Sequence, residues 1–141
     1  MVDESLAKEV GNMMEDGMKG PEDILKLMEL FKQVSAEVDD LKEELEDIDQ
    51  FEGQMVISDK DFKWGVKMGD GIFDYGKGEV DSPSFTMSAE WETMSGMMSG
   101  EIDGTSAYMA GDLEIEGNLQ DTIAYGDYLQ YVAEVLEELQ E

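Results

Sequence analysis

Residues 81–118 constrain the fold most, because they combine a clear order of elements with an absence of cysteine, histidine and lysine. Their pattern predicts a strand at 85–87, a helix capped by Ser88, a short helix capped by Asp103 and a strand within 111–117. A catalytic site needs a positioned proton carrier or nucleophile, whereas this stretch is rich in methionine, aromatic residues and glycine. The pattern therefore favours an apolar cavity that holds a molecule over a site that converts one.

The composition excludes several classes of protein. The chain contains no cysteine, no histidine and no arginine, so disulfides, zinc fingers, histidine-ligated haem, thiol nucleophiles and serine–histidine triads are ruled out. The formal net charge of -27 makes nucleic acid an unfavourable partner and disfavours strong binding to anionic membranes. No acidic loop of the EF-hand type is present, and Asp70-Gly71 fits a turn better than a calcium site. We expect neither a metal nor a cofactor.

The sequence carries no targeting signal that we can identify. The first ten residues are acidic and lack the apolar run of a secretory peptide. No stretch of 18 consecutive apolar residues occurs, so no transmembrane helix is expected. We therefore expect a cytoplasmic protein.

The first 50 residues predict two helices. One covers residues 1–17, and Pro21 suits the first turn of the next. The second helix carries a stripe of apolar residues at alternating steps of three and four, which is the spacing of a heptad seam. The stripe consists of Ile24, Leu27, Phe31, Val34, Val38, Leu41, Leu45 and Ile48. Two interpretations remain open: the stripe packs within its own chain, or two copies of this 24–48 helix form a coiled coil and dimerise the protein.

After residue 50 the pattern changes to strands. A short strand is expected at 55–58, and residues 62–68 alternate apolar with polar or glycine residues, as in a half-buried strand. The turn at 69–71 leads into a return strand, and residues 119–141 predict a closing amphipathic helix. We predict an α+β fold with a five-stranded, mainly antiparallel sheet covered by helices. Its expected division is a helical N-terminal extension over 1–50 and a domain over 51–141.

Residues 81–124 resemble the sterol carrier protein type 2 family. The matching motifs are Phe85-Thr86-Met87, Ser99-Gly100, Asp103, and the strand Gly111-Asp112-Leu113-Glu114-Ile115-Glu116-Gly117-Asn118 that leads into a C-terminal helix. The resemblance covers about 40 residues and does not include residues 1–50. It implies a five-stranded sheet and an apolar tunnel between the sheet and the helices, in which a lipid is bound and no chemistry is performed.

From this resemblance we expect the tunnel to bind a fatty acid, an isoprenoid or a sterol-like lipid for transfer or presentation. Acyl-CoA fits poorly, because the chain lacks arginine and has only four lysines beyond residue 50. The expected ligand-binding residues are Phe85, Met87, Trp91, Met94, Met98, Tyr108, Met109, Leu113, Ile115 and Ile123. The alternative is an acidic interaction module with a filled core that dimerises through the stripe. An enzyme is not expected, because no carboxylate pair stands out as buried and coupled.

Overall fold

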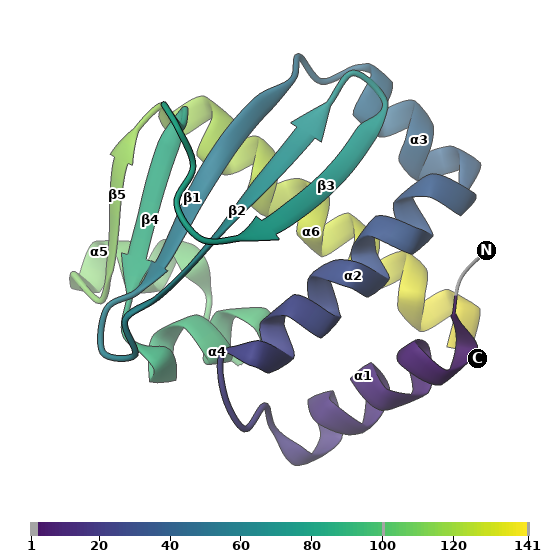
Figure 1. The fold of residues 1–141 in the computed structure, drawn as a ribbon, viewed down its shortest axis with the longest axis horizontal. Helices are drawn as coiled ribbons and strands as arrows, with labels where there is room; N and C mark the ends of the chain where they lie inside the picture. The colour runs from purple at the N-terminus through teal and green to yellow at the C-terminus, as the bar shows by residue number, and fades with distance from the viewer. Residues whose placement is uncertain (1–2, 100, 141) are drawn as a thin grey trace.

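A layer of helices covers one face of a mixed sheet in the computed structural model, which describes residues 3–99 and 101–140 (Figure 1). Within these residues the helices are α1 (Glu4–Asp16), α2 (Glu22–Glu37), α3 (Asp39–Glu46), α4 (Trp91–Ser99), α5 (Gly104–Ala110) and α6 (Leu119–Gln140). The strands are β1 (Phe51–Ile57), β2 (Phe62–Gly69), β3 (Ile72–Lys77), β4 (Phe85–Ala89) and β5 (Leu113–Gly117).

The five strands form one sheet in the order β3-β2-β1-β4-β5. Every neighbouring pair is antiparallel except β1 and β4, which are parallel. After β3 the chain crosses the face of the sheet that is turned away from α6 before it enters β4 (Figure 1). The predicted α+β fold with a five-stranded, mainly antiparallel sheet is confirmed.

Alternation along the strands determines which face of the sheet is buried. In β2 the apolar residues Phe62, Trp64, Val66 and Met68 are buried, whereas Lys63 and Lys67 lie on the opposite, outer face. The hairpin turn between β2 and β3 has positive φ at Asp70 (52°) and at both flanking glycines, which explains the Gly-Asp-Gly sequence there.

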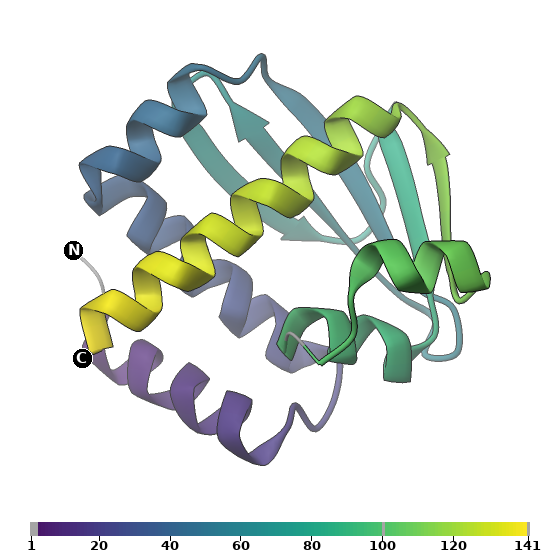
Figure 2. The same cartoon turned by 180° about the vertical axis from the view of Figure 1, so that it is seen from behind.

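The inner face of the sheet is covered by α6, which crosses it diagonally, while α2 packs beside β3 (Figure 2). The start of α6 is fixed by Asn118, whose side-chain oxygen accepts a hydrogen bond from the Asp121 amide at 3.0 Å. One apolar core therefore joins the sheet to helices from both ends of the chain.

Residues 24–48 do not form one continuous helix, which corrects the prediction. At Val38 the backbone is extended (φ -88°, ψ 117°), so α2 ends at Glu37 and α3 begins at Asp39. This bend lets α3 reach the β2–β3 turn, where the carbonyl of Leu45 accepts a hydrogen bond from the Gly71 amide at 3.1 Å. The heptad spacing continues across the bend because both helices bury their apolar side in the same core.

The apolar stripe is used within the chain. Six of its eight residues are buried, and Val38 and Ile48 are partly buried against the core. Of the two interpretations, the structure therefore supports packing of the stripe within its own chain. Pairing of two chains through the same stripe would require these residues to leave the core, so the structure gives the interaction-module alternative no support.

Of the two predicted helix caps, Asp103 is confirmed and Ser88 is wrong. Ser88 does not cap α4, because it lies inside β4; the Asp59 carboxylate instead accepts a hydrogen bond from the Trp91 amide at 2.7 Å. Asp103 caps α5 as predicted and accepts from the Ser106 amide at 3.2 Å. The expected helix end at Gly100 lies outside the described residues, as does the expected start of the first helix at residue 1.

The close contact between β1 and β4 leads to a first testable prediction. Gly53 lies opposite Phe85, and a Cβ at Gly53 would sit 2.4 Å from the Phe85 ring. We expect Gly53→Ala to lower the free energy of unfolding by about 1–3 kcal/mol in urea titration, because the ring must shift in a packed core. Gly76→Ala in β3 is the matched control, since nothing lies within 4 Å of its added Cβ. Equal losses in the two variants would contradict this account of the contact.

Candidate functional site

The candidate site is the apolar layer between the inner face of the sheet and α6. Phe85 of β4 lies at its centre, with ring centroids 5.8 Å from Phe51 of β1 and 5.9 Å from Tyr125 of α6. Farther along α6, the Tyr128 ring lies 5.8 Å from that of Phe73 in β3. Aromatic contacts thus connect α6 directly to β4 and β3, and through Phe85 to β1.

Seven of the ten predicted ligand-binding residues are buried in the apolar core or packed against it. Phe85, Met94 and Leu113 are buried, while the partly buried members packed against the core are Met87, Trp91, Met98 and Ile115. The strand register places Met87 directly opposite Ile115 of β5 and beside Met55 of β1. Residues that are far apart in sequence therefore share one apolar surface.

The other three predicted residues are exposed. Tyr108 is 44% exposed, Ile123 is 61% exposed and Met109 is 81% exposed. The short helix α5 buries Ala107, and Tyr108 and Met109 follow it outside the core. These three side chains do not line the interior in this structure, and their contact with a ligand stays a prediction.

Sequence reasoning did not select several residues of the same layer. Met55 and Trp64 are fully buried and directly opposite each other on β1 and β2. Tyr125 and Tyr128 of α6 are 3% and 2% exposed. The alternation of β2 predicts that Trp64 is on the buried face, but the family motifs do not extend to this residue. The mixed composition of α6 did not show which of its tyrosines would be buried.

The polar atoms of this layer differ in how they are satisfied. The hydroxyls of Tyr128 and Ser35 are hydrogen-bonded to each other at 2.5 Å, which ties α6 to α2. Burial raises the pKa of Tyr128 to about 12, so its hydroxyl stays protonated at neutral pH. In contrast, the Tyr125 hydroxyl and the Trp64 indole nitrogen are buried without a hydrogen-bond partner among the described residues.

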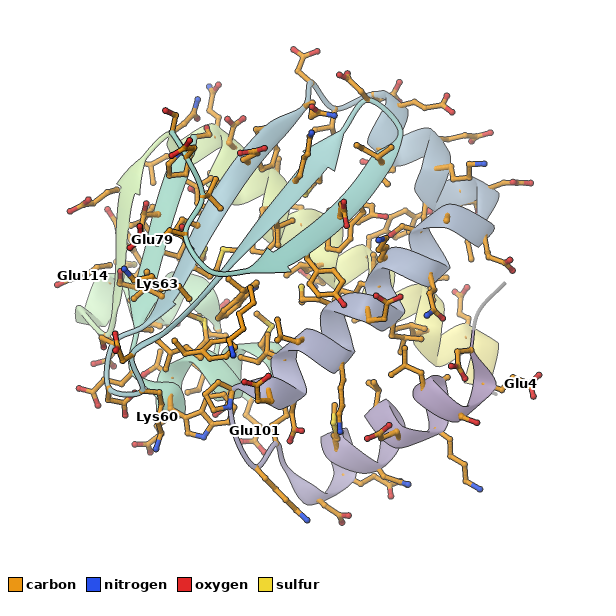
Figure 3. The ribbon with its side chains drawn as sticks, in the orientation of Figure 1. Glu4, Lys60, Lys63, Glu79, Glu101 and Glu114 are labelled. Atoms are coloured by element: carbon orange, nitrogen blue, oxygen red, sulfur yellow. The ribbon has the colours of Figure 1, made fainter. Side chains whose placement is uncertain are left out.

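Charged side chains surround the layer and do not enter it. Lys63 and Glu79, both labelled in Figure 3, form an exposed ion pair at 2.8 Å. Apart from tryptophan and tyrosine, the buried polar side chains of the described residues are Ser35, Gln54 and Thr122, none of which is charged. The described residues contain no cluster of acids that could hold a metal ion. Nor is any helix in the described ranges long and apolar enough to cross a bilayer.

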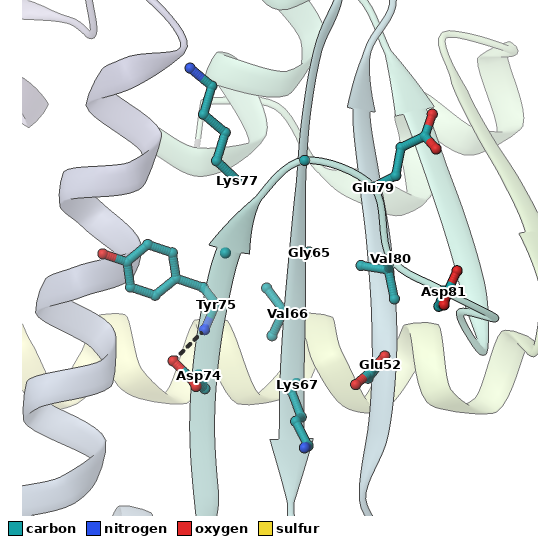
Figure 4. Close-up of a pocket in the computed structure, with 12 residues that line it drawn as sticks. Glu52, Gly65, Val66, Lys67, Asp74, Tyr75, Lys77, Glu79, Val80 and Asp81 are labelled. Atoms are coloured by element: carbon teal, nitrogen blue, oxygen red, sulfur yellow. Dashed lines mark hydrogen bonds between the residues drawn. The ribbon is translucent and has the colours of Figure 1, made fainter.

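Three hollows on the described surface lie outside this layer. One, of about 290 Å³, is on the outer face of the sheet, between β2, β3 and the segment that follows β3 (Figure 4). A second, of about 580 Å³, lies beside the start of α4, and a third, of about 320 Å³, lies between α2 and the β2–β3 turn. None of the three is lined by a predicted ligand-binding residue, so they do not form the expected tunnel.

The chain belongs to the SCP-2 sterol transfer family, whose model matches residues 31–130. This match begins inside α2 and extends well beyond the motifs at 81–124. The sequence-level resemblance to the sterol carrier protein type 2 family is therefore confirmed. No curated protein matches the chain.

Solved structures show the same fold at low sequence identity. A ubiquinone synthesis protein, UbiJ-SCP2, is 12% identical with a TM-score of 0.64, and the alignment covers 79% of this chain and 96% of that one. Palmitated SCP2L2 from Aedes aegypti is 19% identical with a TM-score of 0.52, covering 72% and 89%. The sec-alkylsulfatase Pisa1 from Pseudomonas sp. is 12% identical with a TM-score of 0.58, covering 79% of this chain but only 16% of the enzyme.

The Ser35–Tyr128 hydrogen bond supplies a second prediction. Because each hydroxyl is the partner of the other in a buried setting, removing one leaves the other unsatisfied. We expect Tyr128→Phe and Ser35→Ala each to lower the free energy of unfolding by about 1–3 kcal/mol, and the double variant to lose less than the sum. Urea titration of the four proteins measures the coupling, and strict additivity would show that the two groups do not interact.

Proposed function

We propose that this chain binds an apolar lipid between the inner face of the sheet and α6, and transfers or presents it without chemical change. The proposal rests on membership of the SCP-2 sterol transfer family together with an inner face of the sheet that consists of apolar side chains, several of them methionine. The ligand classes that fit are a fatty acid, an isoprenoid or a sterol-like lipid. The tunnel would form along Met87, Met94 and Ile115, where β4, β5 and α4 meet.

Methionine makes this interior adaptable. Met55 and Met94 are buried, and Met87 lies beside Met55 across the β1–β4 pair. The methionine side chain is unbranched and polarisable, so it adopts new rotamers at low cost and fits irregular apolar shapes. A lipid chain could therefore enter by rearrangement of these side chains, with the sheet itself unchanged.

The charge distribution supports a lipid without a large anionic head group. The chain has no arginine, and Lys26, Lys32, Lys63 and Lys77 are each engaged in an exposed ion pair. A coenzyme A phosphate would therefore meet few free cations and many carboxylates. The two buried tyrosines of α6 have raised pKa values because of burial and stay protonated, which does not suit a general base.

Filling the interior tests the proposed binding site. We expect Met87→Trp and Met94→Trp to abolish uptake of a fluorescent fatty acid from solution, because the larger ring occupies the space that a lipid chain would need. The variants should still unfold in one cooperative transition. Ordinary core packing predicts instead a loss of about 1–3 kcal/mol of stability for each variant.

Met18→Trp is the matched control for these variants. Met18 is partly buried in the α1–α2 connection and is not among the residues proposed to line the tunnel, so the same substitution there should leave uptake unchanged. Normal uptake by Met87→Trp and Met94→Trp would rule out the proposed position of the lipid. Lost uptake in Met18→Trp as well would mean that the assay reports general destabilisation.

The acidic surface predicts that the protein does not bind anionic membranes. With 36 acidic and 9 basic residues, the protein should be repelled by a negatively charged bilayer. We expect no cosedimentation with vesicles of phosphatidylserine and phosphatidylcholine at low salt, where electrostatic forces act over the longest range. Binding that weakens as salt is added would contradict this prediction, because it would require a basic patch.

A further inference from the structure

We propose that the buried Trp64 indole nitrogen and Tyr125 hydroxyl form the polar end of the lipid site and bind the oxygen of a neutral lipid, a hydroxyl or carbonyl oxygen. This inference rests on the proposed function and narrows its ligand class. The oxygen would lie inside the protein, between β2 and α6, with the hydrocarbon chain directed toward β4 and β5.

Burial without a partner distinguishes these two atoms. Trp64 is 0% exposed and Tyr125 is 3% exposed, and neither polar atom has a hydrogen-bond partner among the described residues. The other buried polar side chains of the described core are satisfied: Ser35 pairs with Tyr128, Gln54 bonds four main-chain groups, and Thr122 donates to the Asn118 carbonyl at 2.9 Å. A buried donor left unpaired is costly, so native proteins rarely keep one without a use.

The two groups are neighbours. The Phe85 ring lies 5.9 Å from that of Tyr125, and across the strands Phe85 pairs with Gly53, which pairs with Val66, two residues from Trp64. Burial raises the pKa of Tyr125, and the Trp64 indole N–H opposes that shift through a contact that lacks the geometry of a normal hydrogen bond. Trp64 of β2 and Tyr125 of α6 are 61 positions apart in the chain (125 − 64), so their meeting is a product of the fold. Two polar groups thus lie close together in an otherwise apolar layer. In small-ligand sites, a few such polar groups fix the orientation of the bound ligand.

The side chains around this point can rearrange to admit a ligand. Met55 lies directly opposite Trp64 in the β1–β2 register, and Met87 lies beside Met55 in the β1–β4 register. The Phe85 ring contacts Tyr125 at 5.9 Å. A rearrangement of the two methionines would open a path from Trp64 and Tyr125 toward β4 and β5, which connects the polar end to the proposed lipid site.

The chemistry of the two groups selects the kind of oxygen. An indole N–H only donates, and a phenol hydroxyl donates or accepts, so together they suit an accepting oxygen. An ionised carboxylate would also accept, but none of the buried side chains in the described core is a cation that could compensate its charge. A hydroxyl or carbonyl oxygen needs no such compensation. The site therefore favours neutral lipids over ionised fatty acids.

Competition between chain-matched lipids tests the inference. The full chain is incubated at pH 7 with neutral phosphatidylcholine vesicles that carry equal amounts of hexadecanol, hexadecane and palmitate, and bound species are counted by native mass spectrometry. We expect the wild type to prefer hexadecanol over both other probes. Tyr125→Phe should lower the hexadecanol-to-hexadecane ratio about 5- to 30-fold, because one charge-neutral hydrogen bond in an apolar site is lost.

Tyr128→Phe is the matched control on the same helix. Its hydroxyl is already paired with Ser35, so this variant should be less stable but keep the wild-type ratio of bound probes. Tyr125→Phe removes an unpaired group and should keep or raise the melting temperature. An unchanged ratio in Tyr125→Phe, or a wild-type preference for palmitate, overturns the inference while lipid binding stands. A wild type that takes up none of the three probes overturns the proposed function itself.

Trp64 fluorescence gives an independent readout. The chain has two tryptophans, Trp64 and Trp91, so Trp91→Phe leaves Trp64 as the only indole emitter. Because Trp91 is itself an expected ligand-binding residue, native mass spectrometry must first show that this variant still binds both probes. A buried indole without a hydrogen bond emits at short wavelength, and a hydrogen bond from its N–H shifts the emission to the red. Hexadecanol should therefore cause a red shift that hexadecane does not. Equal spectra with the two bound probes would overturn the inference.

Discussion

Burial of one face of the sheet beneath α6 and α2 is the constraint on which the rest of the structure depends. Met55, Trp64 and Met68 are completely removed from solvent on that face, and α2 contributes Ile24, Leu30 and Val34 to the same core. Burial of apolar surface stabilises the folded chain by about 25 cal/mol per Å². It is the main interaction that opposes the electrostatic repulsion within a chain whose net charge is -27. The few ion pairs of the described surface are exposed and add little.

The sequence predicts the elements well where a single periodicity dominates. The alternation of 62–68 and the turn at 69–71 gave β2 and its hairpin, and the β5 motif gave the last strand. The bend at Val38 was not predictable from the stripe, because the heptad spacing is the same for one long helix and for two helices that bury the same side. The parallel β1–β4 pairing likewise depends on a long crossing segment whose path no local pattern specifies.

The candidate site was predictable only in part. Family motifs selected residues of β4, α4 and β5 that the structure brings into one layer, such as Met87 and Ile115. They could not show that Met109 points away from the core, because a seven-residue helix has too little periodicity to define its buried side. They also missed Trp64 and Tyr125, since a meeting between β2 and α6 is set by the angle at which the helix crosses the sheet. The unpaired polar atoms become visible only once both elements are in place.

Native mass spectrometry of the protein as purified, followed by solvent extraction of whatever is bound, tests the central claim most directly. The account predicts a population of the chain that carries one apolar lipid and loses that mass on extraction. The extracted molecule would define the ligand class without any assumption about the head group. A bare protein that also takes up no lipid from neutral vesicles would contradict the account, because the methionine-rich layer would then be ordinary core.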